Sequence, residues 1–182
     1  MAEHDQAQTV ASDIRHVLVV AGGIDEWFAL DRERWDDRVA SLGQVADRHG
    51  IAWVTLRPYH PGGEPVGEGP PVRTASVGAA TVLIDPVADG RERFAASMRR
   101  LEGEPINEAT VAAVLYEPAD SEPDLVVVIG PSDRLPPSLV WELAYAELVF
   151  VESSWTALSG ADLELAIAEF ARRRRRFGGL DA

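Results

Sequence analysis

Cysteine and lysine are both absent from this chain of 182 residues. The lack of cysteine excludes disulfides, thiolate metal sites and a cysteine nucleophile. Because lysine is missing, all 17 basic residues are arginine, and 30 acidic residues outnumber them to give a formal net charge of -13. Nucleic-acid-binding domains usually carry a basic footprint. We therefore expect no nucleic-acid partner.

Long hydrophobic runs are also missing. No apolar stretch approaches the roughly 18–20 residues of a membrane span, and residues 1–13 lack the basic start and apolar run of a signal peptide. We expect a cytoplasmic protein with at most peripheral membrane contact. Residues 1–13 are expected to form a flexible N-terminal segment. Residues 14–182 are numerous enough for one sizeable core and are expected to form a single domain.

Short continuous apolar runs alternate with amphipathic segments along the chain, a pattern typical of a parallel sheet covered by helices. The patterns predict strands at 17–21, 51–56, 79–84 and 125–129, and helices at 31–49, 90–101, 107–115, 138–150 and 161–176. The stretch Pro58–Pro71 is dense in proline and glycine and is expected to be a loop. The sequence thus predicts an α/β fold with a mainly parallel central sheet flanked by helices.

Two stretches, His16–Trp27 and Pro123–Leu180, carry motifs in an order found in one enzyme family. The second contains a buried strand, a loop, an aromatic helix at Trp141–Phe150 and a terminal Arg-x-Gly element. This pattern resembles the cis-prenyltransferases, the undecaprenyl diphosphate synthase family. The resemblance implies a shortened cis-prenyltransferase-like fold and a link to the condensation of isopentenyl diphosphate with an allylic diphosphate.

The residues expected to perform that chemistry are missing. The family motif His-x-x-x-x-Met-Asp-Gly-Asn-Gly-Arg-Trp contains an aspartate that binds magnesium, and Gly22 stands in its place here. Glycine cannot ligate a hard cation, which needs oxygen donors. Asp25 and Glu26 replace part of the phosphate loop and would repel a diphosphate. The four histidines show no metal-ligand spacing, so no metal, cofactor or catalytic residue is predicted in this chain.

The helices that wall the family's hydrophobic tunnel are also reduced, to the loop at about Pro58–Ser76. A short loop rich in glycine and proline supplies no extended apolar wall. The growth of a long isoprenoid inside this subunit is therefore not expected.

Three residues match substrate-binding positions of the family. Arg134 keeps the place of a diphosphate-binding arginine, although a lone arginine more often forms a surface ion pair or caps a carbonyl. Arg176 and Gly178 match an Arg-x-Gly element that crosses into the neighbouring subunit and holds isopentenyl diphosphate there. The arginines at 172–176 can also be read as a solvated helix end or as a basic patch for phosphate or a membrane surface.

Four residues are candidates for a subunit interface: Trp141, Tyr145, Glu147 and Phe150. Trp141, Tyr145, Leu148 and Phe150 are expected to lie mainly along one helical face. The resemblance assigns part of this face to dimerisation, where large aromatics are enriched, while the alternative is the monomer core. Glu147 matches the family's acid near the metal, but with Gly22 opposite it an interface hydrogen bond is expected instead.

Together these features suggest a non-catalytic accessory subunit of a heteromeric cis-prenyltransferase, similar to the Nogo-B receptor type subunit. Its partner would be a catalytic subunit that carries the aspartate, the tunnel and magnesium, with isopentenyl diphosphate bound at a shared site. Two alternatives are a homodimeric regulatory module that binds a prenyl diphosphate, and a divergent short-chain prenyltransferase that uses Asp25 or Glu26.

Overall fold

A six-stranded sheet organises the molecule, and the computed structural model describes residues 14–59, 72–133 and 135–177. The strand order is β3-β4-β2-β1-β5-β6, and every neighbouring pair is parallel except β3 and β4. The strands are β1 His16–Val20, β2 Trp53–Arg57, β3 Arg73–Val77, β4 Ala80–Ile84, β5 Leu125–Ile129 and β6 Glu147–Val151. The α/β prediction is confirmed.

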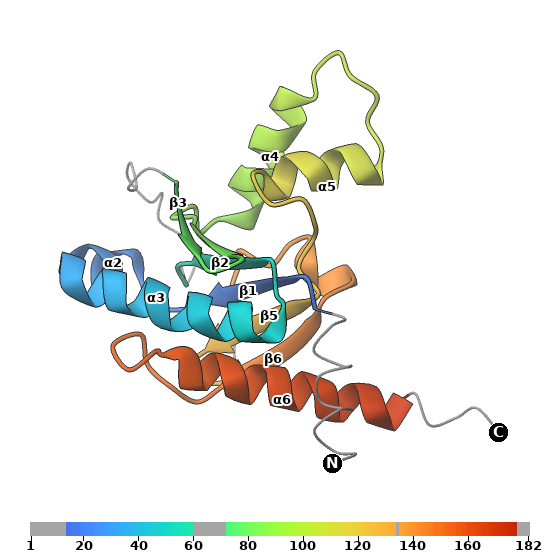
Figure 1. Cartoon of the computed structure of the whole chain (residues 1–182). Helices are drawn as coiled ribbons and strands as arrows, with labels where there is room; N and C mark the ends of the chain where they lie inside the picture. Colours follow the sequence, from blue (N-terminus) through green and yellow to red (C-terminus); the bar gives the residue numbers. More distant parts are fainter. Residues whose placement is uncertain (1–13, 60–71, 134, 178–182) are drawn as a thin grey trace.

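Helices lie on both faces of this sheet (Figure 1). They are α2 Ile24–Ala29, α3 Arg32–His49, α4 Gly90–Arg100, α5 Glu108–Tyr116 and α6 Gly160–Phe177, with a 3₁₀ turn η1 at Glu142–Ala144. Helices α3 and α6 cover one face, and the hairpin of α4 and α5 projects from the other (Figure 1). Among the described residues, no helix combines the length and apolarity that a membrane crossing requires.

The apolar composition of β1 and β5 accounts for their central position in the sheet. Every residue of β1 and β5 is buried, because apolar side chains on both faces of a strand can be covered only where helices or loops lie on each side. Alternate residues therefore enter different cores. Val17 and Val19 pack toward α3 and α6, whereas Leu18 and Val20 pack beneath Leu139 on the opposite face.

Local signals set the bounds of α3. The Asp31 carboxylate accepts the Arg34 amide at 2.9 Å and so caps the first turn. Gly50 ends the helix in the left-handed region with a φ of 71°. Both ends were legible in the sequence, and the predicted helix is confirmed.

The predicted helix over residues 138–150 is wrong. The structure has only the turn η1 there, followed by strand β6, which pairs in parallel with β5. Trp141, Tyr145 and Leu148 have helical spacing, but Leu148–Val151 is a run of apolar, β-branched and aromatic residues that favours a strand. Pairing with the buried β5 decides between the two patterns, so these side chains do not form one helical face.

Two further elements were not predicted. Helix α2 is a single short element directly after β1. Strand β3 occupies the end of the interval expected to be a loop, and it forms an antiparallel hairpin with β4 around Gly78, whose φ is 59°. Residues 60–71, which make up most of the predicted loop, lie outside the described residues.

Candidate functional site

The loop after β1 is closed by tryptophan. Gly22 has a φ of 66°, and a Cβ atom added to it would lie 2.5 Å from Cγ of Trp155. The Trp155 ring stacks on Trp27 with 5.2 Å between ring centroids and 15° between planes. The indole N–H of Trp27 donates to the Ala21 carbonyl at 2.8 Å. Space for a side chain at position 22 is therefore filled by a packed indole.

The start of α2 is occupied by a carboxylate of the chain itself. The Gly23 amide donates to Glu26 Oε2 at 2.7 Å, which satisfies a backbone donor that a bound anion would otherwise use. Asp25 is exposed and adds a second negative charge to the same turn. This arrangement opposes the binding of a phosphate here.

Arg38 holds the loop that carries Trp155. Its guanidinium carbon lies 3.9 Å from the centroid of the Trp155 ring, and its Nε donates to the Leu158 carbonyl at 3.3 Å. Burial lowers the pKa of Arg38. The cation–π contact and the hydrogen bond tie α3 to the loop between β6 and α6.

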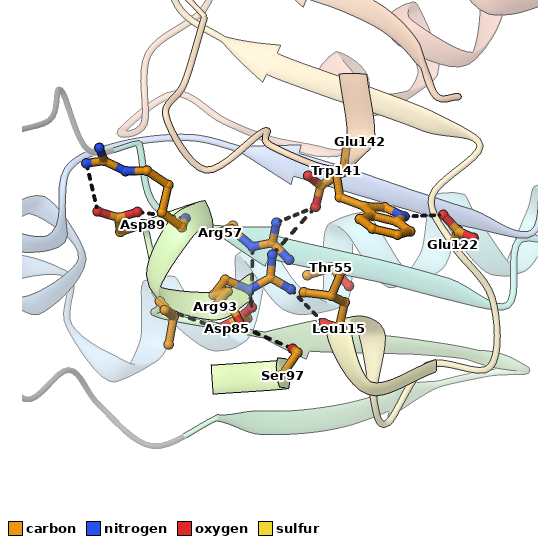
Figure 2. A network of polar contacts seen from close by, with 12 residues as sticks. Thr55, Arg57, Asp85, Asp89, Arg93, Ser97, Leu115, Glu122, Trp141 and Glu142 are labelled. Carbon is orange, nitrogen blue, oxygen red and sulfur yellow. Dashed lines mark hydrogen bonds and ion pairs between the residues drawn. The ribbon is translucent and has the colours of Figure 1, made fainter. Parts of the chain in front are cut away.

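Four buried charges meet at the carboxyl ends of β2 and β4 (Figure 2). Arg57 Nε lies 3.3 Å from Asp85, and Arg57 Nη1 lies 2.9 Å from Glu142. Arg93, from α4, lies 3.3 Å from Asp85 and 3.5 Å from Glu142, and it donates to the Leu115 carbonyl at 2.7 Å. We call Arg57, Asp85, Arg93 and Glu142 the buried quartet. It joins the sheet, α4, α5 and η1.

The charges of the quartet balance one another. Burial by itself would raise the pKa of Glu142, but the positive charges of Arg57 and Arg93 outweigh burial and lower it. Burial, with the added charge of Arg57, lowers the pKa of Arg93 to about 10. Both groups remain charged at neutral pH. Two cations and two anions leave no net charge to attract a phosphate, so the quartet is better suited to holding elements together than to binding substrate.

A cavity of about 120 Å³ adjoins the quartet, lined in part by Thr55, Arg57, Arg93 and Tyr116. The Tyr116 hydroxyl is buried and has no hydrogen-bond partner at standard distance among the described residues. Burial, together with the negative charge of Glu142, raises the pKa of Tyr116. The hydroxyl therefore stays protonated.

His16 links β1 to its neighbours. Its Nδ1 lies 2.7 Å from the Ser121 carbonyl and its Nε2 lies 2.8 Å from the Thr55 hydroxyl. Burial lowers the pKa of His16 to about 4, so the ring is neutral at pH 7. Nδ1–H then donates to the Ser121 carbonyl, and Nε2 accepts from Thr55. These contacts give the histidine a structural role.

Comparison with known proteins identifies the family. The family model for undecaprenyl diphosphate synthases matches residues 80–178 of this chain. The chain belongs to the undecaprenyl diphosphate synthase family. Among curated relatives, it is 44% identical over 104 residues to isoprenyl transferase 2 of Bradyrhizobium diazoefficiens, covering 57% of this chain and 38% of that protein. It is 38% identical over 102 residues to a ditrans,polycis-undecaprenyl-diphosphate synthase of Legionella pneumophila, covering 56% and 39%.

Two solved structures share the fold. A probable undecaprenyl diphosphate synthase from Campylobacter jejuni superposes with a TM-score of 0.61 at 18% identity, covering 91% of this chain and 98% of that one. Lavandulyl diphosphate synthase from Lavandula x intermedia superposes with a TM-score of 0.62 at 14% identity, covering 87% and 95%. By sequence, the chain spans about a third of the length of the curated relatives it matches.

The residues present do not fit the magnesium site of a cis-prenyltransferase. Gly22 offers no oxygen ligand, and Glu147, which the resemblance matches to the family's acid near the metal, is paired with Arg173 at 2.6 Å. In the described part of the chain, no three acidic or histidine side chains gather closely enough to hold a metal ion. The described residues therefore provide no magnesium site of the family's kind.

Two of the three predicted substrate-binding residues, Arg134 and Gly178, lie outside the described residues. The third, Arg176, lies in the last turn of α6. Their roles stay predictions.

The predicted interface residues lie in different environments. Trp141 donates to Glu122 at 2.8 Å and stacks on Phe94 with 6.0 Å between centroids. Tyr145 is 74% exposed. Phe150 packs against the core beneath β1 and β5, while Glu147 begins β6. Only Tyr145 stands clearly in solvent.

Sequence reasoning missed the buried quartet. A signal was available, because Arg57 ends a buried strand and Asp85 directly follows the next one. The carboxyl ends of parallel strands meet at one edge of a sheet, so charges at these positions are expected to lie together. Arg93 and Glu142 offered no comparable signal, since each lies in a segment whose packing only the fold defines.

Proposed function

We propose that this chain is a non-catalytic accessory subunit of a heteromeric cis-prenyltransferase, which makes a polyprenyl diphosphate from isopentenyl diphosphate and an allylic diphosphate. The observation that carries the proposal is the closed end of β1. Gly22 lacks a carboxylate, and Trp155 fills the space where a side chain would begin. A catalytic partner would have to supply the aspartate and the magnesium ion it holds.

An exposed apolar surface supports the existence of a partner. Val140, Leu143 and Tyr145 are 49%, 51% and 74% exposed and lie close together in the segment that leads into edge strand β6. Large apolar side chains gathered on a surface often mark a protein interface. The catalytic subunit would dock here, over the Trp141 side chain that anchors the segment to α4.

The C-terminal element would complete the partner's site. Arg176 and Gly178 would reach the bound isopentenyl diphosphate, because a guanidinium gives planar, paired donors to phosphate oxygens and glycine permits a close backbone approach. Arg134 would add a further contact to a diphosphate. In this arrangement the chain contributes ligands for substrate but no catalytic group.

The first test is co-expression of this chain with a full-length cis-prenyltransferase of the same organism, followed by co-purification and incorporation of labelled isopentenyl diphosphate. Arg176→Ala is expected to leave the complex intact and to lower turnover at least about tenfold, since a charged hydrogen bond to phosphate is lost. Tyr145→Glu is expected to weaken assembly. Leu165→Glu, at a residue 63% exposed on α6, serves as the matched surface control.

The two alternatives predict different results. A homodimeric module would form no complex with the catalytic enzyme but would bind farnesyl diphosphate on its own. A divergent short-chain enzyme would incorporate isopentenyl diphosphate without a partner and would lose that activity in Asp25→Asn or Glu26→Gln. Either result would replace the accessory-subunit proposal.

A further inference from the structure

A recess lies between α5 and the segment that connects α5 to β5. Its volume is about 350 Å³, and sites for small molecules commonly measure about 300–1,000 Å³. The residues that line it belong neither to the β1 loop nor to the buried quartet nor to the proposed docking surface. We call it the alanine recess, and its lining residues are Ala109, Ala112, Ala113, Tyr116, Ala119, Asp120, Ser121 and Glu122.

Alanines form the apolar part of this lining. Ala112 and Ala113 follow Ala109 by three and four residues, so their side chains share one face of α5. Ala119 adds a fourth methyl group from the connecting segment. An unbranched alkyl chain that lies on these methyl groups leaves water, which is favourable. The alanine recess therefore suits a thin apolar chain.

Two carboxylates in the lining are held in place by tryptophans. The Trp141 indole N–H donates to Glu122 Oε2 at 2.8 Å (Figure 2). The Trp53 indole N–H donates to Asp120 Oδ1 at 2.9 Å. Acceptors whose positions are already fixed lose little freedom when a ligand binds. The two carboxylates are therefore prepared to accept further hydrogen bonds.

The negative charge of these carboxylates is poorly neutralised. Glu122 forms no ion pair with another described residue. Asp120 lies 3.2 Å from Arg15, but both side chains are 63% exposed, so this pair is weak in water. The net charge of -13 on the whole chain adds to the attraction for cations. A positively charged head group is therefore favoured at this end of the recess.

A buried hydroxyl in the same lining lacks a partner. The Ser121 carbonyl accepts from His16, but the buried Ser121 Oγ forms no hydrogen bond within the described residues. Buried polar atoms are nearly always hydrogen-bonded. Rotation about the Cα–Cβ bond of Ser121 would bring Oγ to an N–H donor in the recess.

We propose that the alanine recess binds a primary alkylammonium ion. The alkyl chain lies on the alanines, and the ammonium group donates to Glu122 and Ser121. An ammonium group carries three N–H donors and no acceptor, which matches a set of oxygen acceptors with net negative charge. The inference does not rest on the accessory role. Its test uses the purified full chain without a partner or a diphosphate, so the two proposals can fail separately.

The test is a titration with hexylamine, followed by the indole N–H signals of the five tryptophans in ¹H–¹⁵N NMR spectra. The signals of Trp141 and Trp53 are expected to shift, because their indoles contact the carboxylates that bind the ligand. The signals of Trp27, Trp35 and Trp155 should not change.

Three comparison ligands separate the chain from the charge. Butylamine, which is two methylenes shorter, is expected to bind about tenfold more weakly, at about threefold to fourfold per methylene. Hexanol, which lacks the charge, and hexanoate, which carries the opposite charge, are each expected to bind at least about tenfold more weakly than hexylamine.

Two variants test the two parts of the site. Glu122→Gln keeps an oxygen for the Trp141 N–H but removes the charge, and it is expected to weaken hexylamine at least about tenfold without changing hexanol. Ala113→Leu, at an exposed position of α5, fills the recess and should abolish the binding of both. Glu104→Gln changes the net charge equally at an exposed position outside the lining. It is the matched control and should not change the affinity.

Unchanged affinity for hexylamine in Glu122→Gln would refute the proposed site. Equal weakening in Glu104→Gln, or equal shifts of the Trp141 signal with methylammonium, would also refute it. Either result would mean that the net charge of the chain attracts cations without a specific site.

Discussion

At the scale of single residues, Gly22 is the position that bears most on whether this chain could hold a catalytic carboxylate. Its φ of 66° and the 2.5 Å approach of Trp155 to a built Cβ mean that the position is closed by packing, and glycine itself brings no carboxylate. Restoring an aspartate there would require the Trp27–Trp155 stack to move. A single substitution should therefore not restore magnesium-dependent activity.

This reasoning predicts a difference between two glycines with the same backbone conformation. Gly50 has a φ of 71° and nothing within 4 Å of a built Cβ, so Gly50→Ala should cost about 1–2 kcal/mol of stability from backbone strain alone. Gly22→Ala should cost about 1–3 kcal/mol more, because it adds overpacking against Trp155.

Urea unfolding of the two alanine variants measures the difference directly. An equal loss of unfolding free energy in both variants would show that Trp155 can move aside at little cost. The companion variant Gly22→Asp should show no isopentenyl diphosphate incorporation on its own, and any activity it gained over the unchanged chain would count against a closed site.

At the scale of elements, the buried quartet fixes the α4–α5 hairpin to the sheet. Arg93 comes from α4 and contacts Asp85, which follows β4, and Glu142 in η1, and it also reaches the last turn of α5. Figure 2 shows these side chains converging between the strands and α4. The hairpin also packs through a small apolar cluster around Leu101, Leu115 and Tyr116.

Removing one charge of the quartet should therefore loosen this hairpin. Glu142→Gln leaves Arg57 and Arg93 with one buried carboxylate and is expected to cost about 3–5 kcal/mol. Glu117→Gln breaks an exposed pair with Arg100 and should cost less than about 1 kcal/mol.

Chemical denaturation measures the stability cost of each variant, and hydrogen exchange shows which elements lose protection. Faster exchange in α4 and α5 of Glu142→Gln, with α3 and α6 unchanged, is the expected pattern. A cost as small as that of Glu117→Gln would mean that the quartet does not hold the hairpin.

The elements also show which sequence patterns were reliable. Continuous apolar runs bounded by glycine or proline predicted β1, β2, β4 and β5, because a buried strand has no polar face to confuse the pattern. Capping residues set the ends of α3. The prediction failed at β6. Trp141, Tyr145 and Leu148 have the spacing of a helical face, but residues 147–151 pair with β5 as a strand.

At the scale of the whole molecule, acid should destabilise the fold. Burial lowers the pKa of His16 from 6.5 to about 4. Between these values the unfolded chain binds a proton that the folded chain excludes, so stability falls as pH falls. At about 1.4 kcal/mol per pKa unit, His16 alone should remove about 3 kcal/mol of stability over this range.

Glu142 acts in the same direction at lower pH. Its folded pKa is lowered below the ordinary 4.5, so its stabilisation is present above that value and is lost as pH falls below it. Urea unfolding across this range should show the free energy of unfolding declining from about pH 6.5. A His16→Gln variant should show a flatter profile down to about pH 4, and an unchanged profile in that variant would contradict the assignment to His16.

The sequence by itself determined the fold class, the family resemblance and the absence of the aspartate, because these depend on local patterns and on residue identity. Only the tertiary structure decided that Trp155 fills the space beside Gly22, that four charges meet between the sheet and α4, and that residues 147–151 form an edge strand. Each of these depends on contacts between segments far apart in the chain. Their side chains meet only after the sheet has brought the segments together.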